Sequence, residues 1–350
     1  MKKEISDFKL SDRKSQIILG AVESYIENAL PITSEKVQSN LFSSLSSATL
    51  RNELSSLEEM GYLKQLHTSS GRVPTTKAYR YYVDNLMQNQ KFDPNVVDEI
   101  RDKFHTRSNF LLDTLDKVAK QIGEVIDYPV FVRTTGYEKL NIVAINIIPL
   151  ITGQALFLIQ TNEGIINNTI DLPDYILEEH CRDASKFLST NLRNKQVTDV
   201  IENFDKYNLM FKNQIKYFNE MFTSLTNLLK MYVEKGTSSM VRGSTKKLLE
   251  NPELNNMNSA KKFLNIIENE KEIGRIIENI DENSNNEIVF SIGEENESEE
   301  INDYSIVKTN YHLASGINAS IGVVGPERMD YAKIASALKY ITDELRKDKE

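Results

Sequence analysis

The sequence predicts a multidomain protein of the α+β class, and three observations carry this prediction. The chain has 350 residues, of which 40% are hydrophobic, and this suffices for two or three domains at roughly 100 to 200 residues each. Its first 91 residues are patterned as helices followed by a short hairpin. Further along, strand-like segments stand on both sides of a helical stretch, as expected of one α+β domain interrupted by an insertion.

The first three helices are predicted from capping residues and helical spacing. Ser11 can cap a helix whose apolar residues recur on one face from Ile17 to Ile26. Pro31 precedes a second, short helix, and a third is expected to begin near Ser46. In this third helix three leucines share one side, and small or polar residues occupy the others. The leucines are Leu50, Leu54 and Leu57.

A short hairpin is predicted to follow the third helix. Gly61 closes the helix, residues 62–67 alternate as a strand, residues 68–71 supply a turn, and Arg72-Val73-Pro74 returns. Three helices followed by such a hairpin predict a winged helix-turn-helix domain.

The charge of the chain is unevenly distributed. Residues 1–91 contain 12 Lys and Arg against 10 Asp and Glu, a net +2, which leaves −11 for the rest of a chain of net charge −9. Residues 61–80 hold Lys64, Arg72, Lys77 and Arg80 without any acid, which is the local positive face that phosphate contact requires. Residues 281–303 hold nine acids and no Lys or Arg, and we interpret them as a solvated loop.

Double-stranded DNA is the partner that this N-terminal pattern favours. Short side chains let the start of the third helix enter the major groove, where Arg51 and Asn52 can donate to bases or phosphates. The hairpin can follow the backbone or the adjacent minor groove. The predicted DNA-binding residues are Ser46, Ser47, Ala48, Thr49, Arg51, Asn52, Ser55, His67, Ser69, Ser70, Gly71 and Arg72. Winged helices also bind proteins, so a protein-interaction module stays open as the alternative.

The rest of the chain is predicted to be strands around a helical middle. Strands are expected at Val130–Arg133, Ile142–Leu150, Ala155–Gln160, Ile165–Ile170, Glu287–Ile292, Ser305–Tyr311 and Ile317–Val324. Helices are expected at Ile176–Leu188 and Met329–Leu345, among others. The uncharged segment Leu140–Gln160 contains Pro149 and Gly153, so two buried strands explain it better than a membrane span.

The helical middle carries an apolar stripe at alternating steps of three and four residues. Its members are Ile215, Phe218, Phe222, Leu225, Leu229 and Tyr232. Such a stripe must pack against another surface. That surface is either the rest of the same subunit or a second copy in a homodimer, and a dimer would match an inverted repeat in DNA.

Enzymatic and metal chemistry have little support in the sequence. A single cysteine and four histidines exclude an internal disulfide framework and leave little for a metal site, so we expect no metal, no cofactor and a reducing, cytoplasmic setting. No apolar signal-peptide core opens the chain. A catalytic site would have to use His180-Cys181 and Asp183, with His312 as a further candidate. Adjacent residues on a helix point about 100° apart, so we predict that the protein is not an enzyme.

Several segments resemble the HrcA family of heat-inducible transcription repressors. Those in the N-terminal part are Leu45–Leu54, Leu57–Gly61, His67–Thr75 and Tyr79–Asp84. Those in the later part are Asn251–Leu254, Ile292–Asn296, Ser305–Val307 and Gly322–Tyr331. The chain departs from the family's usual residues at a few positions. These are Ser70 for alanine, Thr76 for aspartate, Ala78 for glycine, Lys247 for asparagine and Glu327 for threonine.

The resemblance implies a domain organisation and a function. It implies a winged helix-turn-helix domain at residues 1–91, a GAF-like α+β domain formed by 92–199 and 281–350, and a mainly helical inserted dimerisation domain at 200–280. It further implies a negative regulator of class I heat-shock operons that binds the CIRCE inverted repeat as a homodimer and is released on heat stress. The chaperonin GroEL would assist the active state, and no membrane is implied.

Overall fold

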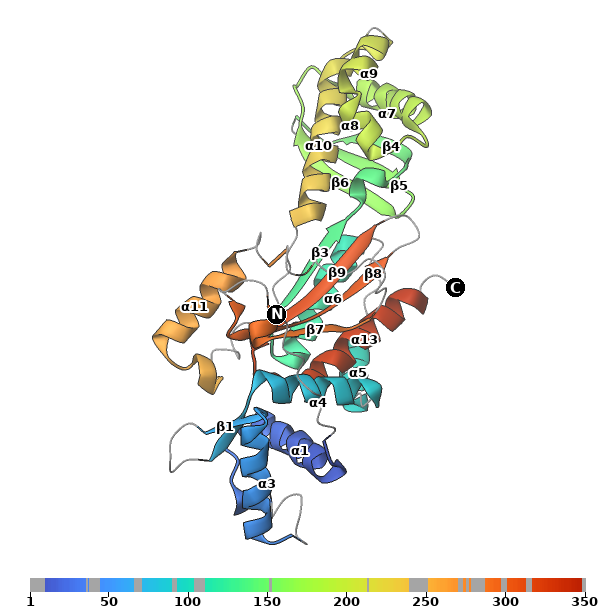
Figure 1. The fold of residues 1–350 in the computed structure, drawn as a ribbon. Coiled ribbons are helices and arrows are strands. Elements are labelled where there is room, and N and C mark those ends of the chain that lie inside the picture. The colour runs from blue at the N-terminus through green and yellow to red at the C-terminus, as the bar shows by residue number, and fades with distance from the viewer. Residues whose placement is uncertain are drawn as a thin grey trace, which may run out of the picture.

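The computed structural model shows three parts stacked along an elongated molecule (Figure 1). It describes residues 10–35, 37, 45–65, 71–89, 93–103, 111–150, 153–212, 214–238, 251–269, 273–274, 277, 287–296, 301–312 and 317–347. We call residues 10–89 the N-terminal module, the four-stranded sheet with its helices the central domain, and residues 137–238 the upper domain. The molecule is a mixed α+β protein with several sheets.

The N-terminal module consists of helices and a small sheet. Its elements are α1 (Asp12–Asn28), α3 (Ser47–Glu59), β1 (Leu63–Gln65), β2 (Arg72–Pro74) and α4 (Thr76–Gln88). Ser11 caps α1 as predicted, because its hydroxyl accepts a hydrogen bond from the Lys14 N–H at 3.4 Å. Residues 34, 35 and 37 are helical, in agreement with the short second helix. The three leucines of α3 are fully buried against α1 and α4, as their spacing predicted.

The central domain is built on one antiparallel sheet. Its strands are β3 (Val130–Thr135), β7 (Val289–Ile292), β8 (Tyr304–His312) and β9 (Asn318–Pro326), in the order β3-β9-β8-β7. Three helices cover one face of this sheet: α5 (Pro94–Lys103), α6 (Leu111–Ile126) and α13 (Tyr331–Lys347). The other face packs on α11 (Met257–Glu268) and the short turn of helix Pro252–Leu254.

The upper domain has its own sheet and its own core. Its strands β4 (Ile142–Pro149), β5 (Gln154–Thr161) and β6 (Gly164–Asp171) pair in sequence order. Its helices are α7 (Glu178–Leu192), α8 (Val197–Glu202), α9 (Phe204–Phe211) and α10 (Phe218–Ser238). Helix α7 lies along the edge of β4, where Ser189 and Ser185 accept from the backbone N–H groups of Ile145 and Ile147, each at 2.8 Å.

Strand pairing corrects the predicted grouping of the strands. The sequence grouped the strands of residues 142–170 with the late strands, and placed the start of the insertion at residue 200. In the structure β4, β5 and β6 form a separate sheet whose core joins Tyr137 to Val233. The strands of residues 142–171 therefore do not share a sheet with the late strands. Local alternation predicts that a segment is a strand, but it does not tell which strand becomes its neighbour.

The apolar stripe on α10 packs within the single chain, which is the first of the two alternatives that its spacing left open. Phe218, Phe222, Leu225 and Leu229 are at most 1% exposed within the single chain, and Phe222 stacks on Phe204 with ring centroids 5.2 Å apart. Ile215 and Tyr232 pack on the same core and are partly buried. The stripe is thus occupied inside the subunit, since helical spacing predicts a packed face without specifying what it packs against.

The interpretation of Leu140–Gln160 as two strands is confirmed by β4 and β5. Among the helices that the structure describes, none is both long enough and apolar enough to cross a membrane.

Replacing Phe222 with alanine tests whether the α10 stripe is core or interface. We expect Phe222→Ala to lower the free energy of unfolding by about 3 to 5 kcal/mol, the range for removing a large buried aromatic ring, as measured by urea unfolding. The control is Leu177→Ala, because Leu177 lies in the same domain and is 54% exposed. Unchanged stability combined with loss of self-association in sedimentation would contradict the burial of Phe222.

Candidate nucleic-acid interface

The N-terminus of α3 is held by a group of hydroxyls. The Ser46 hydroxyl caps the helix by accepting from the Thr49 N–H at 3.1 Å, and it lies 2.8 Å from the Thr49 hydroxyl. Ser47 donates to Ser34 at 3.3 Å, which links α3 to the preceding short helix. These serines and Thr49 were predicted DNA contacts, and in the structure their first role is to fix where α3 begins.

One face of α3 is exposed and carries free hydrogen-bond donors. Ala48, Arg51 and Asn52 are exposed. They share a face because Arg51 and Asn52 follow Ala48 by three and four residues. In the described part of the chain neither Arg51 nor Asn52 forms a hydrogen bond or an ion pair with another residue. The opposite face of the helix is buried through Leu50 and Leu54. The helix therefore presents a guanidinium and an amide beside a methyl group, the combination that reads base edges in a major groove.

Arg72 and Ser55, both predicted DNA contacts, bind to other residues of the module. The Arg72 Nε donates to Glu58 Oε2 at 2.8 Å, and its NH2 donates to the Ser55 hydroxyl at 3.0 Å. The Arg72 side chain is only 16% exposed. These contacts tie the hairpin to α3 beside its exposed face.

Gly71 has a structural role in the same hairpin. The backbone of Arg72 pairs with Ile32, with N···O distances of 2.7 and 2.9 Å. A Cβ on Gly71 would lie 2.6 Å from the Ile32 carbonyl oxygen, so only glycine permits this approach. The hairpin residues His67, Ser69 and Ser70, also predicted to touch DNA, lie outside the described residues.

The basic residues of 61–80 are mostly engaged within the protein. Lys77 donates to the Met60 carbonyl at 3.0 Å and lies over the Tyr62 ring, 4.4 Å from its centroid. On α4, Arg80 donates to Glu295 and, at 2.8 Å, to the Phe290 carbonyl. Glu295 belongs to the acidic segment interpreted as a solvated loop; it is exposed, but it lies in the short helix Gly293–Glu295 and pairs with Arg80. A count of cations along the chain did not show which of them have acidic partners.

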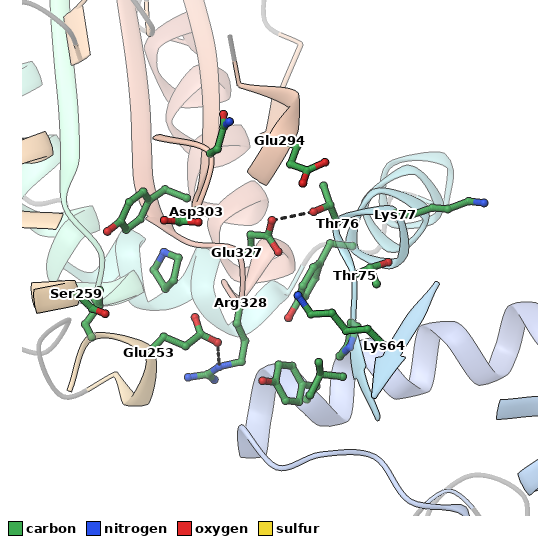
Figure 2. Close-up of a pocket in the computed structure, with 18 of the residues that line it drawn as sticks. Lys64, Thr75, Thr76, Lys77, Glu253, Ser259, Glu294, Asp303, Glu327 and Arg328 are labelled. Carbon is green, nitrogen blue, oxygen red and sulfur yellow. Dashed lines mark hydrogen bonds and ion pairs between the residues drawn. The ribbon is translucent and has the colours of Figure 1, made fainter. Parts of the chain in front are cut away.

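Thr76 and Glu327 connect the N-terminal module to the central domain. The Thr76 hydroxyl donates to Glu327 Oε1 at 2.8 Å (Figure 2). Burial raises the pKa of Glu327, and the hydrogen bond from Thr76 opposes this rise. The resemblance noted in the sequence led us to expect aspartate at 76 and threonine at 327, and the two positions are in contact here.

Arg328 forms a second connection beside the first. Its NH1 donates to the Ile26 carbonyl in the last turn of α1 at 2.7 Å, its NH2 to Asn251 Oδ1 at 2.8 Å, and its Nε to Glu253 Oε1 at 2.9 Å. A cavity of about 830 Å³ lies between the N-terminal module, residues 253–262 and the central domain. Lys64 and Thr75 line it from the module, and Glu327 and Arg328 line it from the opposite side (Figure 2).

The residues considered for catalysis are not arranged as a site. His180 Nδ1 accepts a hydrogen bond from the Leu177 N–H at 2.9 Å. This nitrogen is therefore not free to accept a proton from a neighbouring side chain. Burial, followed by the nearby Glu178 charge, raises the pKa of the Cys181 thiol, so the nucleophilic thiolate is disfavoured. His312 lies on β8 of another domain. Within the described residues no group of three His, Cys, Asp or Glu side chains could hold a metal ion.

The chain is similar to a protein family, to named relatives and to a solved structure. The family model described as the HrcA protein C-terminal domain matches residues 112–335. A heat-inducible transcription repressor of Ruminiclostridium cellulolyticum is 30% identical over 349 residues, covering 97% of each chain. One of Thermoanaerobacter sp. strain X514 is 31% identical over 345 residues, covering 96% of each. A crystal structure of a hypothetical protein matches with a TM-score of 0.73 at 21% identity, covering 97% of this chain and 98% of that one, and supports the fold alone.

These matches extend over nearly the whole chain, and they define it as a transcription repressor rather than an enzyme. Both the family model and the relatives at 30% and 31% identity support the same family membership. The chain belongs to the HrcA family of heat-inducible transcription repressors.

A double-mutant cycle tests the contact between the side chains at positions 76 and 327. Thr76→Asp should place two carboxylates in contact and weaken the joint by about 1 kcal/mol, within the range for residues in direct contact. Adding Glu327→Thr should restore most of the loss. Hydrogen exchange of the α4 amides measures both.

The pH dependence of Thr76→Asp has a definite sign. A buried carboxyl with a raised pKa favours folding in its protonated form, so its contribution is present at low pH and is lost as the pH rises through the folded pKa. The penalty of Thr76→Asp should therefore be full at pH 7 and shrink toward pH 4.5, the ordinary glutamate value. Additive effects of the two substitutions, with no pH dependence, would argue against the contact.

Proposed function

We propose that the N-terminal module is a winged helix-turn-helix domain that binds double-stranded DNA, with α3 as the recognition helix. The observation that carries this proposal is the exposed pair Arg51 and Asn52, whose donors have no partner among the described residues, on a helix anchored by its opposite face. The order of helices, the β1–β2 hairpin and its bridge to Ile32 support it. Arg72, Lys77 and Arg80 all have partners within the protein. Contacts of α3 with base edges therefore contribute more to DNA binding than a broad basic surface does.

We further propose that two copies bind an inverted repeat. Pairing two modules on a two-fold axis suits a palindromic operator, and the family resemblance implies that this operator is CIRCE, upstream of class I heat-shock operons. With the α10 stripe buried, the contact between copies must use another surface. Helix α9 exposes Leu209 and Met210, which are 71% and 56% accessible. This supports the upper domain as the dimerising domain and leaves the central domain for the GAF-like assignment.

Repression follows from occupancy, and heat relieves it in this proposal. A dimer on the operator blocks polymerase in the cytoplasm. Heating shifts the protein to a form that cannot bind, and a free GroEL-type chaperonin returns it to the active form.

Substitutions on α3 test the recognition face. We expect Asn52→Ala and Arg51→Ala each to weaken operator binding by about 5- to 150-fold, the equivalent of roughly 1 to 3 kcal/mol for a lost base contact. Fluorescence anisotropy at several salt concentrations measures this. Asn52→Ala should leave the salt dependence unchanged because asparagine is uncharged, whereas a phosphate contact by Arg51 would lower its slope by about one.

The matched control for these substitutions is Arg101→Ala. Arg101 lies on α5, where it pairs with Asp98 and is 61% exposed, and its loss should leave DNA binding unchanged. Equal affinity of the wild-type chain for random DNA and for the inverted repeat would contradict sequence-specific repression. It would favour the protein-interaction alternative.

Heat release has its own test. Operator binding by the purified chain should fall after heating and recover when chaperonin and ATP are added, as followed by mobility shift. In the cell, deletion of the gene should raise expression from a chaperone-operon reporter at normal growth temperature. A reporter that stays constant on deletion would refute repression of that operon.

A further inference from the structure

Besides the contact between Thr76 and Glu327, two arginine attachments at different helices hold the N-terminal module on the central domain. At α4, Arg80 donates to Glu295 Oε1 at 2.7 Å and to the Phe290 carbonyl at 2.8 Å. At the end of α1, the Ile26 carbonyl accepts from Arg328 at 2.7 Å. Helices α1 and α4 pack on each other, so both attachments act on the same module.

The two sides of this joint differ in how they are filled. Along the later part of α4 the contact is close and apolar, because Tyr82, Val83 and Leu86 are buried in one core with α13. Towards the start of α4 and the end of α1 lies the cavity of about 830 Å³, which Tyr79, Tyr25 and Arg328 line. Close packing along α4 resists separation of the two parts, but the cavity leaves room for the module to turn about α4. A tie at the cavity side is needed to prevent that rotation.

Arg328 is built to be that tie. Its side chain is only 8% exposed, and its three donating nitrogens each have a separate acceptor. A planar guanidinium held at three points has a fixed direction. The acceptor on the module side is a carbonyl in the last turn of α1, where the helix dipole favours a positive charge. Glu253 and Asn251 hold Arg328 in place, and Arg328 in turn holds α1.

We propose that Arg328 is a positioning residue for operator recognition, which sets the spacing between half-sites that the repressor accepts. This inference rests on the proposed function, in which two modules bind one inverted repeat. If each module is held at a fixed angle, the two recognition helices have one fixed separation and relative rotation. Arg328 touches no DNA in this role, and it acts through the orientation of α3.

Spacer length is a sensitive probe of that orientation. Two added base pairs turn one half-site by about 70° and move it by about 7 Å relative to the other. A rigid pair of readers cannot then engage both half-sites, and it loses the gain from linked binding, roughly 100-fold or more. A pair whose modules can turn keeps most of that gain.

The experiment measures operator affinity as a function of spacer length. An operator is first selected by the full-length wild-type chain from random duplex DNA, and duplexes with one or two base pairs added or removed are then titrated. Wild-type affinity should fall by about 100-fold at two base pairs, whereas Arg328→Met should fall by less than about tenfold. Half-site sequence preference should be the same in both. Arg101→Met, which removes an exposed arginine from α5, is the matched control and should behave as wild type.

A second variant guards against misfolding of the first. Glu253→Gln keeps the size of the side chain and leaves Arg328 in place without its ion pair, and it should relax the spacing in the same direction. A merely structural loss would lower affinity for every spacer by the same factor. If Arg328→Met and Glu253→Gln both fold and both retain the wild-type dependence of affinity on spacer length, Arg328 does not set the spacing. If the wild-type chain selects no inverted repeat, the proposed function itself fails, which is a separate outcome.

Discussion

The burial of the three leucines on α3 is the constraint on which the candidate interface depends. Leu50, Leu54 and Leu57 are fully buried, and about 1.5 to 3 kcal/mol of transfer free energy per leucine opposes their exposure. This fixes the rotation of α3 about its own axis, and so it determines that Arg51 and Asn52 face outward. The serine cap and the ties from Arg72 add to this constraint by fixing where the helix starts and where the hairpin lies beside it.

Much of the fold was predictable because its signals are local. Capping by Ser11 and Ser46, the buried leucines and the predicted strands agree with the structure, with ends that differ by a few residues at most. Pairing between distant strands has no such local signal. Nothing in the alternation of residues 142–170 shows that these strands form their own sheet, which is why the sequence grouped them with the late strands.

The site was predictable in part for the same reason. The exposed face of α3 follows from its spacing, but the partners of charged residues do not. Arg80 pairs with Glu295, which is 215 positions away in the sequence. Arg72 pairs with Glu58 of α3, the helix beside which it was expected to contact DNA. The α10 stripe shows the same limit, since its period is equally compatible with a core and with a subunit interface.

The serines of α7 have a consequence for the fate of heated molecules. Ser185 and Ser189 occupy the outward N–H groups of β4, so this border of the upper sheet cannot template an additional strand from a neighbour. A regulator that passes repeatedly through a partly opened form in the proposed thermal cycle would otherwise risk fibrous, irreversible association. Two hydroxyls, one helical turn apart, thus help to keep this sheet from pairing with a neighbouring molecule.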